Sequence, residues 1–119
     1  TLKVNSIDGG REVYAIGDVT TVPLPGRYKP DMALSLPKAG VFAEAQGRVV
    51  AHQIAARILG REPSETFDGK GYCFLETGGG LAVKADGSFF ALPHPVFQKQ
   101  VPSEAQFNDK LAWVARYLK

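Results

Sequence analysis

The chain has 119 residues, 45% of them hydrophobic, and a formal net charge of +2 from 14 basic and 12 acidic side chains. A globule of this length buries roughly 65% of its unfolded surface, so a single core is expected, and the scattered basic residues argue against a nucleic-acid partner. One cysteine and the lack of any apolar run near the ~20 residues that cross a bilayer exclude a disulfide scaffold and a membrane span, which leaves a cytoplasmic protein or a peripheral one at a membrane surface.

Two short strands are predicted near the amino end. Leu2 and Val4 alternate with polar residues, and an Asp-Gly-Gly turn follows them. The second strand, VYAI at 13–16, is apolar throughout, which fits a strand covered on both faces, as in a parallel sheet. It ends on Gly17 and Asp18. Because ligands of open α/β sheets bind at the carboxyl ends of strands, we expect Asp18 to accept hydrogen bonds from a sugar or polyol.

A proline-rich loop and a long helix come next. Four prolines exclude regular structure through most of residues 20–37, and loops of this length are usually functional or disordered. Apolar residues at helical spacing then predict a helix over 37–59, with Pro37 in its first turn and Gly60 just past its end. Small residues on several sides imply packing against more than one layer. The amino end of the helix favours an anionic or electron-rich heterocycle at Gly40.

The second half predicts a small antiparallel meander. The triple glycine at 78–80 and the Asp-Gly pair at 86–87 separate three short apolar runs, which are 72–75, 81–84 and 88–92. An extended, proline-containing segment follows, and Ser103 caps a final helix to about residue 118. Phe107, Leu111, Val114 and Leu118 make its apolar stripe, with Trp113 and Tyr117 broadening it.

Three segments in this order carry a family resemblance: VYAIGDVTTVPLPG, LPKAGVFAEAQGRVVAHQIAARILG and FDGKGYCFLETGGGLAVKADG. They resemble the carboxy-terminal third of the pyridine nucleotide-disulfide oxidoreductase-like flavoproteins, which have two dinucleotide-binding domains. The similarity is greatest to the sulfide:quinone oxidoreductase and flavocytochrome c sulfide dehydrogenase branch, with type II NADH dehydrogenases as cousins. The resemblance implies an α+β fold in which residues 1–60 end an FAD-binding α/β domain. Residues 61–119 then form an interface-type antiparallel sheet and a carboxy-terminal helix.

The resemblance also implies where FAD would lie. Asp18 would bind the ribityl or pyrophosphate part of the cofactor, and Gly17 would allow its close approach. Lys38, Ala39 and Gly40 would lie beside the pyrimidine edge of the isoalloxazine, where the helix end stabilises the negative charge gained on reduction.

Cys73 has two readings. A lone cysteine between Tyr72 and Phe74 in an apolar strand is usually an inert buried hydrophobe. In the sulfide-oxidising relatives, a cysteine in the corresponding strand faces the flavin and pairs with another from the amino-terminal portion, forming a redox disulfide. That partner is absent from this chain, and thiolate reactivity depends on the environment of the sulfur. His52, in the helix without acidic or cysteine ligands nearby, indicates no metal site.

These patterns predict the function of a parent protein. The sequence starts at Thr1 without methionine, in what reads as a strand, and lacks the glycine-rich turn that binds the FAD adenosine, so we expect a catalytically incomplete carboxy-terminal piece. The parent would be an FAD-dependent oxidoreductase that passes electrons from its flavin to a quinone or haem acceptor. Type II NADH dehydrogenase chemistry and a non-catalytic dimerisation or interaction module are the alternatives. A peripheral membrane contact and a homodimer are further expectations.

Overall fold

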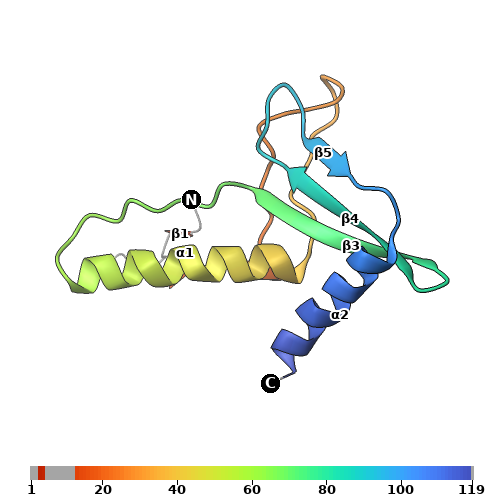
Figure 1. The fold of residues 1–119 in the computed structure, drawn as a ribbon. Helices are drawn as coiled ribbons and strands as arrows, with labels where there is room; N and C mark the ends of the chain where they lie inside the picture. Colours follow the sequence, from red (N-terminus) through yellow and green to blue (C-terminus); the bar gives the residue numbers. More distant parts are fainter. Residues whose placement is uncertain (1–2, 5–12, 119) are drawn as a thin grey trace.

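The computed structural model describes residues 3–4 and 13–118 of the chain. It confirms a mixed α+β class, in which two helices accompany a small antiparallel sheet (Figure 1). In chain order the elements are β1 (Lys3–Val4), β2 (Val13–Tyr14), the 3-10 helix η1 (Gly17–Val19), α1 (Gly40–Ile58), β3 (Lys70–Gly78), β4 (Leu81–Ser88), β5 (Val96–Lys99) and α2 (Glu104–Tyr117).

The prediction of a buried strand at residues 13–16 is wrong in both the length and the burial of the strand. β2 holds only Val13 and Tyr14, and it pairs antiparallel with β1. Val13 is 45% exposed and Ile16 is also exposed. The run is left half-open because β1 is its sole strand neighbour in the described chain. The Asp-Gly-Gly turn predicted before it lies outside the described residues.

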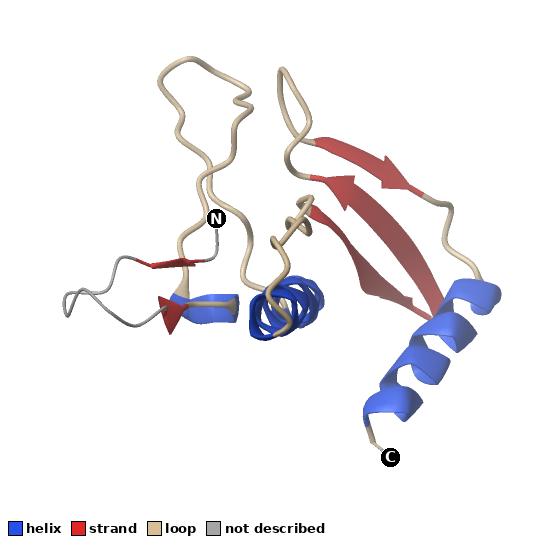
Figure 2. Cartoon of the chain, turned by 90° about the vertical axis from the view of Figure 1, so that its left-hand side faces the viewer, coloured by secondary structure: helices blue, strands red, loops and turns tan. Residues whose placement is uncertain are grey.

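The proline-rich loop contains no helix or extended strand, as predicted, and its two arms run side by side. Its two arms are joined by backbone hydrogen bonds: Leu24 N donates to Leu34 O at 2.9 Å and Leu36 N donates to Val22 O at 2.8 Å. The loop contacts the segment between β4 and β5, where Arg27 N donates to Pro93 O at 2.8 Å. Figure 2 shows the two loops rising side by side.

Helix α1 begins three residues later than predicted and ends one residue earlier. Pro37 therefore precedes the helix, whose N-cap is Ala39. Gly60 ends the helix as predicted, with a positive φ. Its N–H donates to Arg57 O at 3.0 Å, and Arg61 N donates to Ala56 O at 2.8 Å. The last buried residue of the helix is Val50, and beyond it Ile54 is 42% exposed and Ile58 is 79% exposed. The expectation of packing on several layers is thus wrong for the second half.

The sheet has the order β3-β4-β5, antiparallel throughout, so the predicted meander is confirmed in kind. The triple glycine joins β3 to β4 as predicted, whereas Asp86 and Gly87 lie inside β4 rather than in a turn. A side chain at Gly87 would come within 2.7 Å of the Phe89 ring, so this glycine serves close packing. The chain turns only after Ser88, and the third strand is therefore residues 96–99 instead of 88–92.

Helix α2 starts where predicted, with the Ser103 hydroxyl accepting a hydrogen bond from Gln106 N at 3.3 Å. Gln106 is buried and ties the helix to β4, because its Nε2 donates to Val101 O at 2.6 Å and its Oε1 accepts from Lys84 N. The predicted stripe is only partly covered: Phe107 and Val114 are half-buried, whereas Leu111 and Leu118 are exposed.

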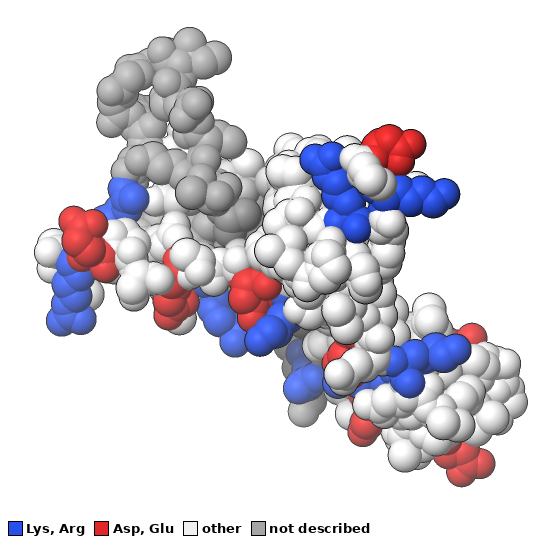
Figure 3. Space-filling view, turned by 90° about the horizontal axis from the view of Figure 1, so that it is seen from above, with Lys and Arg blue, Asp and Glu red and all other residues white. Residues whose placement is uncertain are grey.

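The molecule is open rather than compact. Its radius of gyration is 17.3 Å, against about 13.5 Å expected for a compact domain of this length. Its accessible surface of 8512 Å² likewise exceeds the roughly 6,300 Å² of a compact monomer of this mass. None of the described helices combines the length and apolar character needed to cross a bilayer. Figure 3 shows acidic and basic side chains interspersed over one face.

The main core lies where the proline-rich loop, the start of α1 and the segment after β4 meet. Leu24, Leu36 and Phe42 are its buried centre, and Phe67, Phe89 and Phe90 pack around them. The Phe42 ring contacts Phe89 edge to face, with ring centroids 5.0 Å apart. This core packs the amino end of α1 against the proline-rich loop and the segment after β4, and so fixes the position of that helix end.

Candidate functional site

The Gly17–Asp18 turn lies directly against α1. Gly17 begins η1 with φ +69°, and a Cβ at this position would lie 3.2 Å from the Ala43 Cβ. A larger residue would be strained by the backbone conformation and crowded by the helix. The sequence analysis expected this glycine to make room for a cofactor; the close neighbour in the structure is the helix itself.

Gln46 fixes the turn to the helix, and sequence reasoning missed it. Its side chain is 1% exposed, and its Oε1 accepts a hydrogen bond from Gly17 N at 2.7 Å. The amide of Gly17 is therefore satisfied within the protein. A signal was present in the sequence, because Gln46 lies four residues from both Phe42 and Val50, on the face of α1 that is buried.

A chain of polar contacts runs from the turn to the segment before α1. Thr20 Oγ1 donates to Gly17 O at 2.7 Å, and Lys38 Nζ donates to Thr20 O. The structure thus brings Gly17, Asp18, Lys38 and Ala39 to the lining of one small cavity. Gly40, the first residue of α1, is exposed and directly follows Ala39.

Asp18 and the amino end of α1 offer complementary groups. The Asp18 carboxylate is on an exposed residue and is an acceptor. The amides of Gly40 and Val41 have no acceptor one turn earlier within the helix, so this end carries partial positive charge. Hydroxyl donors suit the first group and an electron-rich edge suits the second. An acceptor beside a helix end with unpaired N–H groups would suit the polyol tether and the ring edge of a flavin.

The cavity itself is too small to hold a cofactor ring. Its internal space is about 10 Å³, close to the minimum for one water molecule. A flavin would have to lie across the exposed rim formed by Asp18 and the helix end, with most of its surface covered by atoms from outside the described chain.

Cys73 is exposed, contrary to the inert buried reading, and it is the chain's single cysteine. Alternation along β3 puts Cys73 on the same side of the strand as Gly71, about 7 Å away. Gly71 packs against the Phe42 ring, since a Cβ there would come within 2.2 Å of it. Because Phe42 also lines the Gly17 cavity, one aromatic ring connects the strand of Cys73 with the Asp18 turn.

The histidines serve other contacts. His52 Nδ1 lies 2.6 Å from Glu65 Oε2 on the surface of α1, and the His94 ring stacks on Tyr28 with centroids 5.0 Å apart. Within the described ranges no group of three histidine, cysteine or acidic side chains is arranged to hold a metal ion.

Comparison with protein-family models, curated proteins and solved structures finds no match to this chain.

Proposed function

We propose that the chain is the carboxy-terminal, flavin-facing part of an FAD-dependent oxidoreductase of the sulfide- or quinone-linked type. The observation that carries this proposal is the meeting of the Gly17–Asp18 turn with the segment that opens α1, at one cavity rim. The resemblance assigns cofactor contacts to these same residues, which lie some twenty positions apart in the sequence.

Different residues of this rim would bind different parts of the cofactor. Asp18 would accept hydrogen bonds from the hydroxyl groups of the ribityl tether, and such charge-assisted bonds are among the stronger ones. Ala39, Gly40 and the helix end would face the pyrimidine edge, where partial positive charge favours an electron-rich ring. When bound, the flavin supplies the electron transfer between donor and acceptor.

Lys38 and Gln46 would act as positioning residues. Lys38 binds the carbonyl of Thr20 and Gln46 binds the amide of Gly17, so both ends of the turn are fixed before any cofactor arrives. A preformed turn reduces the ordering cost of binding.

The open surface of the chain supports a larger parent flavoprotein as its partner. The accessible surface exceeds that of a compact monomer by about 2,200 Å², an excess comparable with a large protein interface. The same observation favours the second candidate, an interaction or dimerisation module without catalysis. The flavoprotein proposal includes a quinone or haem acceptor, a peripheral membrane contact and a homodimer. Its variant is type II NADH dehydrogenase chemistry.

Replacing Asp18 by alanine in the parent protein separates the two candidates. We expect the affinity for FAD to fall by about tenfold or more, because a hydrogen-bonded charged acceptor contributes roughly 1.5–3 kcal/mol. The measurement is flavin absorbance per protein after gel filtration, together with a titration of the apoprotein. The matched control is Asp31→Ala, an exposed acid in the proline-rich loop. Equal flavin content in both variants would favour the interaction module.

Cys73→Ser in the parent protein tests the sulfide branch. We expect sulfide oxidation to fall by about two orders of magnitude or more, because a serine hydroxyl is a far weaker nucleophile than a thiolate. Flavin content should stay unchanged, since Cys73 lies outside the residues that line the Asp18 rim. Undiminished sulfide oxidation would exclude a redox role for Cys73, and NADH oxidation that survives the substitution would favour the type II NADH dehydrogenase variant.

A further inference from the structure

A second cavity of about 390 Å³ opens on another flank of α1. Val41 and Ala45 form its helical wall, whereas Phe42 and Gln46 face the Gly17 turn. Ala43 and Gln46 contact Gly17 from one side of α1. Since each helical residue turns about 100°, Val41 and Ala45 point in a direction roughly 150° away from that side. The two sites are therefore separate, and the volume of the second falls within the range of small-molecule pockets.

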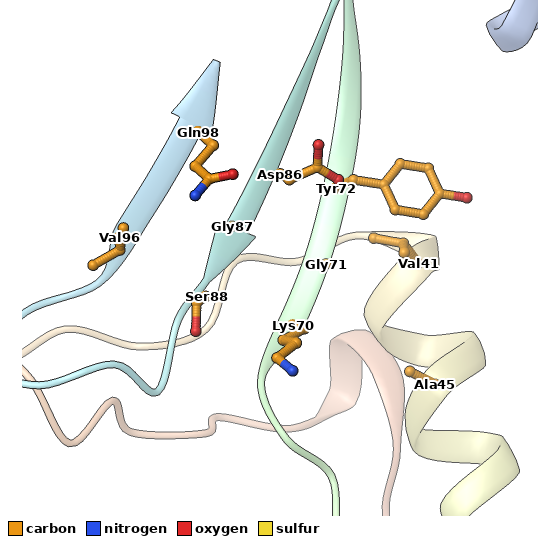
Figure 4. A pocket seen from close by; sticks show the side chains of 10 residues that line it. All are labelled: Val41, Ala45, Lys70, Gly71, Tyr72, Asp86, Gly87, Ser88, Val96 and Gln98. Atoms are coloured by element: carbon orange, nitrogen blue, oxygen red, sulfur yellow. The ribbon is translucent and has the colours of Figure 1, made fainter. Parts of the chain in front are cut away.

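The floor of this cavity is one face of the sheet near the start of β3 (Figure 4). Strand register places its side chains in two rows across the three strands. The first row is Lys70, Ser88 and Val96, and the second is Tyr72, Asp86 and Gln98. Because neighbouring strands lie about 4.8 Å apart, each row spans about 10 Å.

Polar side chains come from all three strands of the floor, and Val41, Ala45 and Val96 form apolar parts of the cavity border. Asp86 occupies the middle strand and is half-buried, with Ser88 two residues along. Asp86 Oδ1 is 3.2 Å from Lys84 Nζ, and a carboxylate has about four acceptor positions, so this ion pair leaves acceptor capacity on Asp86. Figure 4 shows the Tyr72 side chain extending from β3 toward Val41, which borders the cavity on the helix side.

We propose that this cavity binds a flat, amino-substituted nitrogen heterocycle of the adenine type. The amino group donates to the Asp86 carboxylate, and the ring lies between the apolar side chains of α1 and Val96. The Gln98 amide, on β5, donates to a ring nitrogen, while the Lys70 ammonium, 3.6 Å from Asp68 Oδ2, stays at the border of the cavity. This inference rests on the sheet and α1 alone and does not depend on the proposed flavin contact.

The experiment is a titration of the full 119-residue chain with adenosine, followed by amide chemical shifts in 15N-labelled protein. We expect shifts that saturate and that cluster at Gly71, Gly87 and Ser88. Purine riboside, which lacks the amino group, should bind about tenfold more weakly, since the lost hydrogen bond involves a charged acceptor. Asp86→Asn should reduce this discrimination to less than threefold, whereas the control Asp109→Asn should preserve it.

A second variant guards against a folding defect in Asp86→Asn. Ala45→Phe adds a ring to the helical wall of the cavity and should abolish the adenosine shifts while the rest of the spectrum keeps its dispersion. The proposal is overturned if adenosine and purine riboside bind equally, if the shifts lie away from the sheet floor, or if Ala45→Phe binds adenosine as the unmodified chain does. Failure of this test would leave the Asp18 result unaffected, because the two sites share none of the probed residues.

Discussion

Replacing Phe42 by alanine is expected to lower the free energy of unfolding by about 3–5 kcal/mol, the usual cost of removing a buried aromatic ring. Phe42 is buried at the centre of the main core and contacts Phe67 and Phe89 edge to face. It also fills the space over Gly71, so it joins the loop, α1 and β3. A domain of this size has about 5–15 kcal/mol of stability, so the loss is a large part of the total.

Denaturant unfolding followed by far-UV circular dichroism measures this change. Ile58→Ala is the matched control, because Ile58 lies on the same helix and is largely exposed. Its effect should stay within about 0.5 kcal/mol, as is usual for surface substitutions. Similar losses in the two variants would contradict the role of Phe42 as the centre of the core.

Gln46→Leu is expected to destabilise the chain by about 2–3 kcal/mol, although leucine is apolar and the site is fully buried. The physical reason is the Gly17 N–H, which would lose its acceptor while remaining against the helix. Denaturant unfolding gives the free energy, and hydrogen exchange gives a second readout. The amide of Gly17 should exchange at least tenfold faster, because its protecting hydrogen bond is gone.

Gln53→Leu provides the control for this substitution. Gln53 lies on the same helix, and its Nε2 donates to Glu65 O at 2.7 Å in an exposed contact. We expect a change below about 1 kcal/mol, since water can replace a lost surface partner. If Gln46→Leu behaved like Gln53→Leu, the turn would not depend on the buried amide.

The candidate site was partly predictable from the sequence. A strand end followed by a loop and a helix start indicated that Asp18 and Ala39 would meet, and the structure places both at one rim. The spacing of Gln46 from Phe42 and Val50 indicated that its side chain could be buried, but its partner Gly17, 29 residues earlier, could not be predicted from the sequence. Only the fold shows which flank of α1 faces the turn.

Local signals alone determined several features of this protein. The positive-φ glycine after α1, the Ser103 cap of α2 and the triple-glycine turn each act within a few residues, so the sequence was sufficient for them. Tertiary packing decided the features that depend on distant neighbours. Gly87 lies inside β4, paired with Gly71 and Phe97, and a Cβ there would come within 2.7 Å of the Phe89 ring and 3.2 Å of the Phe97 ring. Val13, Ile16 and Ile58 stay exposed because the described chain covers residues 13–16 and the end of α1 only in part.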